Sequence, residues 1–480
     1  MKANLVKAGE RIARQLEKRL IEAGWSAGHY LGREEDLARQ IGASRAIVRE
    51  AIAIAEMDGF IECRRGQAGG LFVGIPAADT RNSMLRNYLV FAGVKGSQIQ
   101  NARLTIEKIL CEAVARRATR ADAQKLRLLA QLPDDRSPAS YAKHNTTLNK
   151  EILSLAQMPP LALCMTPLLQ ANTDIGVWNG ASESDVGQLS AETADLRREL
   201  VEALISFDDS RMLAIQHQLS AAHVHWTERF STPPTDVEDA IVRLTMLGQK
   251  FAMHGADGRL VKKPQAVARL IASSIAGDPP DREGRIGSED EIVRRLGVSG
   301  GVFREAVRTL ERYGIVRVRR GNDGGLFKRT PDPQAIVNAV GLFIATTQRP
   351  SPVVLGRTVH RLGRSATTLV VNDLEQGNEL TRKELVKARA ALTDEKPPDL
   401  FGSYRFLANA VEDQVLVALL GILLVPLDAI AASADSAPYD AQQMRELQRS
   451  FLDLIEARDL HMARRCLVEL GRIDVVRREI

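Results

Sequence analysis

The chain has 480 residues, enough for about three or four domains of ~150 residues each. Hydrophobic residues make up 45% of the sequence and charged residues 26%, so the chain can bury sizeable cores. Aromatic residues make up only 4%, which argues against a β-sandwich or a carbohydrate-binding cleft. A net charge of +5 permits an anionic partner but does not require one.

Cysteine usage and the apolar segments favour a cytoplasmic protein. The four cysteines are scattered without a CxxC pair, which is typical of a reducing compartment. The first 20 residues carry charges throughout and do not resemble a signal peptide. The most apolar run, Val415–Leu427, is shorter than the ~20 residues that span a bilayer, and it contains Pro426. We therefore expect this run to form a buried helix, and we expect no membrane partner.

A segment of 43 residues occurs twice in the chain. Leu31–Val73 aligns with Ile286–Lys328 at an offset of 255 residues and without a gap, and 17 of the 43 positions are identical. Each copy follows a helical pattern and precedes ~150 residues with helical periodicity and few strand signals. The sequence therefore predicts that a unit of one small domain and one helical domain has been duplicated in tandem.

The predicted domain boundaries follow from this repeat. Two prolines interrupt the helical pattern in Ser231–Asp236, close to the join of the two halves. In chain order we predict a first winged-helix domain at 1–76, a first helical domain at 80–232, a connecting helix and linker at 233–258, a second winged-helix domain at 259–330 and a second helical domain at 333–480. We call the two small domains the first and second heads.

Each head has the sequence pattern of a winged helix-turn-helix. In the first head, Glu34–Ile41 has apolar residues spaced for one buried helix face, and Gly42 permits a sharp turn. Ser44 is a good N-cap for the next helix because its hydroxyl can accept a free backbone N–H, and Gly59 can end that helix. The β-prone runs that follow surround a glycine-rich turn and predict a hairpin. Two helices, a short turn and a hairpin make a winged helix-turn-helix.

The second of these helices carries the residue type that binds guanine. Its N-terminal turns enter the DNA major groove in this arrangement. Arg45 and Arg49 lie there on one face, and arginine can bind guanine O6 and N7 with two hydrogen bonds. Such a pair alone is more often a solvated face, but turn glycine, capping serine, arginine and basic wing occur together twice and favour DNA binding. The predicted DNA-contacting residues are Arg33, Ser44, Arg45, Arg49, Arg64, Arg65, Gly66, Gln67 and Gly69 in the first head and Ser299, Arg304, Arg319, Arg320, Gly321, Asn322 and Gly324 in the second.

Both heads resemble the DNA-binding domain of the GntR family of bacterial transcription regulators. The family pattern of "GVSR", "VREAL", "LE", a glycine and a "G-G" wing is matched by Ile41–Val73 and by Leu296–Lys328. The helical segments resemble the FCD (FadR C-terminal) ligand-binding and dimerisation domain in length, helical content and fragments such as "VLVALLGIL" and "FLDLIEARDLHMARR". The resemblance implies a mainly α fold, double-stranded operator DNA as the partner, a small-molecule effector and no cofactor.

The chain departs from the family pattern on both sides of the turn. Family members usually carry an arginine in the helix before the turn, where this chain has Glu35 and Asp290, and Arg33 is the candidate substitute. The family arginine after the capping serine is Arg45 in the first head and Gly300 in the second.

These departures predict unequal heads. Of the arginine pair, only Arg304, which matches Arg49, remains in the second recognition helix. Gly300 and Gly301 each cost up to about 1 kcal/mol in its first turn. A lost bidentate contact removes roughly 1–3 kcal/mol of base discrimination. We therefore expect the first head to read sequence more stringently and the second to contribute mainly phosphate contacts and a relaxed half-site.

The resemblance also raises the question of a metal, because many FCD domains hold a divalent cation with one Asp and three His. The matching positions, taken without gaps, are Asn145, Asn149, Arg197 and Leu219 in the first half and Phe401, Arg405, Gln448 and Leu470 in the second. Neither set suits a divalent metal. A shifted register could bring together some of His144, His217, His223 and His225. We expect no metal, and the effector-binding residues stay undefined.

The doubled organisation predicts an intramolecular pseudo-dimer. Family members mostly work as two-fold dimers, and here one chain carries two heads and two helical domains. The two helical domains are expected to pack on each other and to present the heads to an imperfect palindrome. Tethering raises the effective concentration of the second head, so that a weak head still adds affinity. Dimerisation of the chains, which would give four heads, stays open.

We expect the chain to be a sequence-specific DNA-binding regulator and a ligand-responsive repressor. The alternative, from a different class, is a degenerate regulator that acts as a protein-interaction or sensor module with weak non-specific DNA binding. An enzyme is not expected, because the sequence has no P-loop, no dinucleotide glycine fingerprint, no HExxH and no GxSxG.

Overall fold

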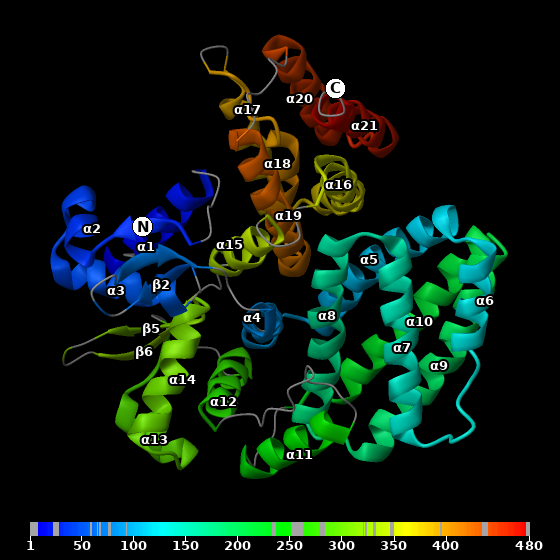
Figure 1. Cartoon of the computed structure of the whole chain (residues 1–480), viewed down its shortest axis with the longest axis horizontal. Helices are drawn as coiled ribbons and strands as arrows, with labels where there is room; N and C mark the ends of the chain where they lie inside the picture. The colour runs from blue at the N-terminus through cyan, green and yellow to red at the C-terminus, as the bar shows by residue number, and fades with distance from the viewer. Residues whose placement is uncertain are drawn as a thin grey trace. The chain divides into compact units, whose positions relative to one another are not determined.

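The computed structural model contains two compact units (Figure 1). The first unit comprises residues 1–81 and 334–480, and the second comprises residues 82–333. Each unit therefore combines a helix-turn-helix from one half of the sequence with a helical bundle from the other half. The structure describes residues 8–22, 28–57, 60–64, 66, 69–74, 78–92, 94–232, 237–250, 263–277, 284–319, 321, 324–329, 333–345, 350–393, 396–433 and 440–476.

The first head lies in the first unit and consists of three helices and a three-stranded sheet. Its elements are α1 (Ala8–Glu22), β1 (Tyr30–Gly32), α2 (Glu34–Ile41), α3 (Arg45–Met57), β2 (Ile61–Arg64) and β3 (Gly70–Val73). The strands are antiparallel in the order β1-β3-β2, with Ile61 opposite Val73. Ile12 of α1 and Ala51 of α3 pack in a small core. The predicted hairpin wing after a helix-turn-helix is confirmed for this head.

The remainder of the first unit is a helical bundle, which we call the second bundle because it comes from the second half of the chain. Its helices are α15 (Gln334–Phe343), α16 (Pro352–Glu375), α17 (Glu379–Ala391), α18 (Gly402–Ala410), α19 (Gln414–Ser433), α20 (Ala441–Glu456) and α21 (Leu460–Val476). Helix α19 packs along α15 and α16, and α1 of the first head packs against α19. The unit thus joins the first head to the second bundle.

The apolar run that we expected to be a buried helix forms most of α19. Its burial is confirmed, because Leu419, Leu420, Ile422 and Leu423 are fully covered. The run itself, Val415–Leu427, has 13 residues, fewer than the ~20 that span a bilayer. Residues on either side extend it to 20 residues, past Pro426. Among the described residues, α19 is the one helix that is long and apolar enough to cross a membrane. The segment concerned is Gln414–Ala431, and 61% of it is buried within the structure.

The second unit contains the first bundle, built from the first half of the chain. After α4 (Ala78–Phe91), which spans the unit boundary, its helices are α5 (Gly96–Arg117), α6 (Arg120–Leu129), α7 (Pro138–Ala156), α8 (Pro159–Trp178), α9 (Glu183–Ile205) and α10 (Asp209–Arg229). Helices α5, α7, α8, α9 and α10 pack side by side (Figure 1). Local chemistry sets their starts: Ser182 Oγ accepts the Asp185 N–H at 3.2 Å, and the Asp185 carboxylate accepts the Ser182 N–H at 2.9 Å.

The second head completes the second unit and has the same order of elements as the first. It follows α11 (Val237–Lys250) and consists of α12 (Lys263–Gly277), β4 (Arg285–Gly287), α13 (Glu289–Leu296), α14 (Gly300–Arg312), β5 (Val316–Arg319) and β6 (Gly325–Lys328). Its strands are antiparallel in the order β4-β6-β5. Ala266 and Leu270 of α12 share a core with Trp178 and Trp226 of the first bundle. The second head is therefore packed onto the first bundle.

Candidate nucleic-acid interface

The turn between α2 and α3 has the geometry that the sequence predicts. Gly42 follows the last residue of α2 with φ +71°, a left-handed conformation that glycine adopts without steric cost, and its N–H donates to the Ala38 carbonyl at 3.0 Å. Three residues separate the two helices, and Ser44 Oγ accepts the Ile47 N–H at 3.5 Å. Leu37 and Val48 are buried, which turns the opposite faces of both helices to solvent.

Arg45 and Arg49 are both exposed on the first two turns of α3, and both form ion pairs with α2. The Arg45 guanidinium lies 3.1 Å from the Glu35 carboxylate, and the Arg49 guanidinium lies 2.9 Å from that of Glu34. The exposed fraction of the side chain is 69% for Arg45 and 72% for Arg49. Exposed ion pairs contribute only ~0–1 kcal/mol, so DNA can displace the carboxylates. Arg33 is also exposed and is the N-terminal cap residue of α2.

The second head retains one of these two ion pairs. Gly297 has φ +62° at its turn, and Ser299 Oγ accepts the Val302 N–H at 3.4 Å. The Arg304 guanidinium lies 3.4 Å from the Glu289 carboxylate, which repeats the contact of Arg49 with Glu34 at an offset of 255 residues. No side chain at Gly300 can repeat the contact of Arg45.

One exposed arginine on α14 is not among the residues predicted from the sequence. Arg308 lies one turn after Arg304, and both are exposed. The spacing of four residues puts them on one face of the helix. The matching residue in the first head is Ala53. The arginine pair of the second head, Arg304 and Arg308, thus lies one turn further from the helix start than the pair of the first head. The spacing of four residues between Arg304 and Arg308 is the sequence signal that predicts this pair.

The first wing carries a positioned arginine at its base. The Arg64 guanidinium lies 4.2 Å from the centre of the Phe72 ring, and its Nε donates to the Glu62 carboxylate at 3.0 Å. Gly66 has φ +106°, which the turn at the wing tip requires, and the Gly69 N–H donates to its carbonyl at 2.9 Å. Arg65 and Gln67, two of the predicted contacts, lie outside the described residues.

The second wing is more basic than the first. Residues 61–74 contain one acid and two arginines, a net charge of +1, whereas residues 316–329 contain one acid and five basic residues, a net charge of +4. The Arg319 guanidinium lies 4.1 Å from the centre of the Phe327 ring, as Arg64 does from Phe72. Arg317 replaces Glu62 at the matching position, and the sequence analysis did not include it. Gly321 has φ +113° and its carbonyl accepts the Gly324 N–H at 2.9 Å, while Arg320 and Asn322 lie outside the described residues.

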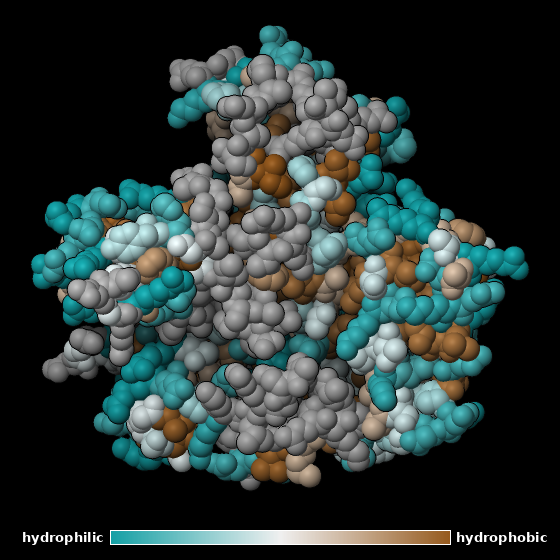
Figure 2. Space-filling view, in the orientation of Figure 1, coloured by the Kyte–Doolittle hydropathy of each residue, from teal (hydrophilic) through white to brown (hydrophobic). Residues whose placement is uncertain are grey.

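Hydrophilic side chains cover the visible surface of α2 and α3, and most of that of α13 (Figure 2). Residues 33–57 carry four basic and five acidic side chains, so the positive groups that can face DNA are individual exposed arginines of the recognition helix and the wing. The geometry can therefore place two guanidinium groups against base edges in the first head, with phosphate contacts from the wing.

Comparison with known proteins identifies this region. Residues 8–73 match the family described as bacterial regulatory proteins, gntR family. The match begins at the first residue of α1 and ends at the last residue of β3. Residues 8–73 form a GntR helix-turn-helix domain. The GntR domain therefore includes every predicted contact of the first head.

Proteins similar to this chain carry regulator names. It is 28% identical over 133 residues to the Uxu operon transcriptional regulator of Escherichia coli K12, a match of 28% of this chain and 50% of that protein. It is 29% identical over 117 residues to the Exu regulon transcriptional regulator of the same strain, a match of 24% and 44%. The Uxu operon regulator of Haemophilus influenzae is 27% identical over 135 residues, a match of 26% and 48%. The chain spans about half the length of these curated relatives.

A solved structure aligns with part of the chain. Streptococcus agalactiae GntR aligns with 45% of this chain and 99% of its own, at 17% identity and a TM-score of 0.27.

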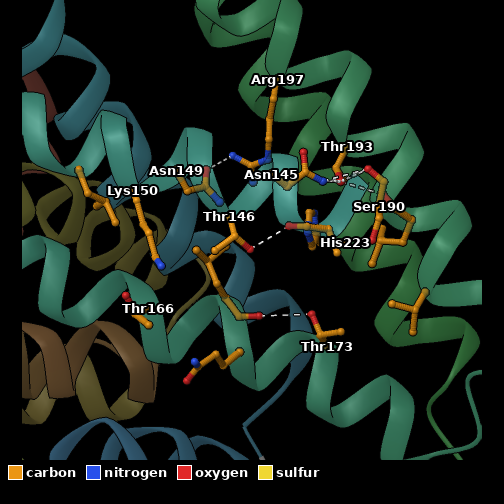
Figure 3. Close-up of a pocket in the computed structure, with 16 residues that line it drawn as sticks. Asn145, Thr146, Asn149, Lys150, Thr166, Thr173, Ser190, Thr193, Arg197 and His223 are labelled. Carbon is orange, nitrogen blue, oxygen red and sulfur yellow. Dashed lines mark hydrogen bonds between the residues drawn. The ribbon is translucent and has the colours of Figure 1, made fainter. Parts of the chain in front are cut away.

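The first bundle does not fit the metal that the FCD resemblance implies. The matching positions hold two amides, Asn145 and Asn149, and a buried guanidinium, Arg197 (Figure 3), together with the apolar Leu219. His223 Nδ1 is engaged with the Leu219 carbonyl at 2.7 Å. Among the described residues there is no group of three or more His, Cys, Asp or Glu that could hold a metal ion. Amides and a cationic side chain are not a ligand set for a divalent metal.

Proposed function

We propose that the chain is a sequence-specific transcription regulator in which two unequal GntR-type heads bind double-stranded DNA. The observation that carries this proposal is the repeated contact of Arg49 with Glu34 and of Arg304 with Glu289. In both heads an exposed arginine is held by one residue of the preceding helix, on the turns of α3 and α14 that a helix-turn-helix inserts into the major groove.

In this proposal the two heads make different contacts with DNA. The first presents Arg45 and Arg49 at the start of α3, which suits bidentate contacts with guanine. The second has Gly300 in place of Arg45 and a wing of higher charge, which suits phosphate contacts. The operator is then an imperfect palindrome with one stringent and one relaxed half-site.

The arrangement within each unit supports a pseudo-dimer made from one chain. Each unit joins a head from one half of the sequence to a bundle from the other half. We extend the proposal to a tandem duplication with domains at 1–76, 80–232, 259–330 and 333–480 joined by 233–258, and to FCD-type bundles that receive an effector. A cytoplasmic, ligand-responsive repressor is the mode of action that follows from the family resemblance, and further dimerisation of the chain stays open.

Selection of DNA from a random pool tests the proposal. The purified chain is incubated with 40-base-pair random duplexes at 150 mM salt, and the bound fraction is sequenced over successive rounds. We expect one enriched motif with two half-sites of unequal information content. Two equally stringent half-sites would contradict the division between the heads, and no enrichment over the input pool would contradict sequence-specific binding.

A second function, that of a degenerate regulator used as a protein-interaction or sensor module, is favoured by one observation. Gly300 and Gly301 occupy the first turn of α14, where neither has a side chain to contact a base. This alternative predicts weak binding that is equal for all duplexes and falls steeply with salt. The selection experiment separates the two functions, because purely electrostatic binding enriches no motif.

A further inference from the structure

The two wings carry the same phenylalanine but a different residue opposite it. In the first wing, Phe72 of β3 pairs with Glu62 of β2, and in the second wing Phe327 of β6 pairs with Arg317 of β5. An arginine two residues further along β2 or β5 lies on the same face, because side chains alternate along a strand. Of these three side chains, only the one opposite the ring differs between the wings.

In the first wing, Glu62 holds the donors of Arg64. Arg64 Nε donates to Glu62 Oε1 at 3.0 Å, and Arg64 Nη2 donates to Glu62 Oε2 at 3.1 Å. These hydrogen bonds raise the pKa of Arg64 and lower that of Glu62. Two parallel bonds are the geometry in which a guanidinium group binds a carboxylate or a phosphate. The Glu62 carboxylate thus occupies the place that a phosphate would take.

In the second wing, the strands supply no carboxylate at this place, because β5 and β6 contain no acidic residue. The Nε of Arg317 is buried and has no hydrogen-bond partner among the described residues. Burial, followed by the charges of Arg319 and Arg329, lowers the pKa of Arg317. The three guanidinium groups repel one another, and an anion beside them relieves that repulsion.

The acids closest to this hairpin do not account for the difference between the wings. Glu311 of α14 accepts the Val318 N–H at 3.0 Å, and Glu56 of α3 accepts the Cys63 N–H at 3.4 Å at the matching place in the first head. This contact is common to both heads. Asp323, at the tip of the second wing, lies outside the described residues. The exchange of a glutamate for an arginine opposite the ring is therefore the change of charge on this face.

A phosphate fits the second wing better than a base edge does. The guanidinium groups of Arg317 and Arg319 lie against one ring, 5.8 Å and 4.1 Å from the centre of Phe327, so a single anion can contact both. The site offers donors and positive charge, which match a phosphate group, whereas a base edge is neutral. Stacking on the ring also holds the arginines in place before DNA binds.

We propose that the residue opposite the phenylalanine decides whether a wing binds a backbone phosphate of double-stranded DNA. In the second wing, Arg317 and Arg319 form the phosphate site. In the first wing, Glu62 closes the matching site by occupying Arg64. The assignment of DNA as the partner rests on the proposed function, whereas sequence-specific recognition is not needed, because phosphate contacts carry no sequence information.

The salt dependence of DNA binding tests the second wing. A labelled 20-base-pair duplex of scrambled sequence is titrated with the full chain at 50, 100 and 200 mM salt, and binding is followed by fluorescence polarisation. Loss of one phosphate contact reduces the slope of log K against log salt by about 0.9. We expect this change from Arg317→Gln, with a loss of affinity of up to about fivefold. Lys328→Gln removes the same charge from the opposite face of the hairpin and is expected to change the slope much less.

Opening the first wing tests the other half of the proposal. Glu62→Gln frees Arg64, and we expect the slope to steepen by about 0.9 and the affinity for the scrambled duplex to rise. Glu50→Gln removes the same charge from an exposed position of α3 and leaves the donors of Arg64 occupied, so its slope should stay close to that of the wild type. If circular dichroism shows that Arg317→Gln is misfolded, this second pair of variants decides the matter.

Equal changes of slope in Arg317→Gln and Lys328→Gln would overturn the phosphate site of the second wing. A slope for Glu62→Gln no steeper than that for Glu50→Gln would overturn the closed site of the first wing. Both outcomes are distinct from a failure of the proposed function, which the selection experiment reports as the absence of an enriched motif. An enriched motif with unchanged salt slopes would overturn the wing proposal alone.

Discussion

Asp174 of α8 and Arg269 of α12 form a buried ion pair between the first bundle and the second head. Their charged atoms are 3.4 Å apart, 0% of the Asp174 side chain and 4% of the Arg269 side chain are exposed, and Arg86 of α4 lies 3.5 Å from the same carboxylate. The Arg269 guanidinium also lies 5.6 Å from the centre of the Trp178 ring. Residues 95 positions apart in the sequence thus fix the head to the bundle.

Breaking this pair is expected to destabilise the second unit. Arg269→Ala leaves the Asp174 carboxylate buried with one cation fewer, which costs about 3–5 kcal/mol. Trp178 and Trp226 both belong to this unit, so tryptophan fluorescence during urea unfolding reports mainly on it. The control is Arg229→Ala, whose pair with Asp185 is half exposed and contributes ~0–1 kcal/mol. Equal shifts of the urea midpoint in Arg269→Ala and Arg229→Ala would contradict a stabilising role of the buried Asp174–Arg269 pair.

Restoring the missing arginine is expected to improve the second head. A Cβ added at Gly300 would lie 3.3 Å from Glu289 Oε1, a close contact that the flexible glutamate side chain can relieve by moving. An arginine at this position could pair with Asp290 as Arg45 pairs with Glu35. A bidentate guanine contact adds roughly 1–3 kcal/mol of discrimination, so affinity for a duplex with two first-head half-sites should rise about five- to 150-fold. Gly300→Ala restores helix propensity alone. If both variants gain equally, the gain comes from the helix and not from a base contact.

The acids of α2 are expected to weaken DNA binding. Glu35 holds Arg45 in the free protein and lies on the helix where family members usually carry an arginine. Glu35→Gln frees Arg45 and removes a charge that repels phosphate, and we expect affinity to rise up to about fivefold at low salt. The control is Glu50→Gln, which changes the net charge by the same amount at an exposed position of the neighbouring helix, α3. A gain no larger than that of Glu50→Gln would show that Glu35 acts only through the total charge.

The buried His223 is expected to make the second unit less stable in mild acid. Because its folded pKa lies well below that of an unfolded histidine, ~6.5, the unfolded state takes up a proton first as the pH falls. Stability is therefore full above pH ~6.5 and falls below it by up to ~1.4 kcal/mol per pH unit until the folded pKa is reached. Urea midpoints between pH 7.5 and 5.5 measure this slope. His223→Gln should flatten it, and His225→Gln, at an exposed position, should not.

Local chemistry made the helix-turn-helix predictable. Gly42, Ser44 and the alternation of apolar residues on α2 act within a few positions of the chain, and the structure places them as expected. The ion pairs of Arg45 and Arg49 with α2 were not predicted, because they depend on how two helices cross. Arg308 was missed for a simpler reason: comparison with the first head directed attention to positions that carry arginine there.

The contacts that organise each unit could not be derived from sequence periodicity. Nothing in the pattern of α8 or α12 indicates that Asp174 meets Arg269, and the assignment of each head to the other half's bundle depends on such contacts. Arg197 was recognised only as a poor metal ligand. Its burial beside Arg103 and Glu107 is a property of the packed helices.

The most direct test of the central claim compares Arg49→Ala with Arg304→Ala. Fluorescence polarisation titrations use the duplex enriched by selection and a scrambled duplex, at 50, 100 and 200 mM salt. Two unequal heads predict that Arg49→Ala loses about five- to 150-fold in affinity for the selected duplex, that Arg304→Ala loses less, and that both variants keep wild-type affinity for the scrambled duplex within a few-fold. Equal losses on the selected duplex would contradict unequal heads, and no loss from either change would contradict recognition through α3 and α14.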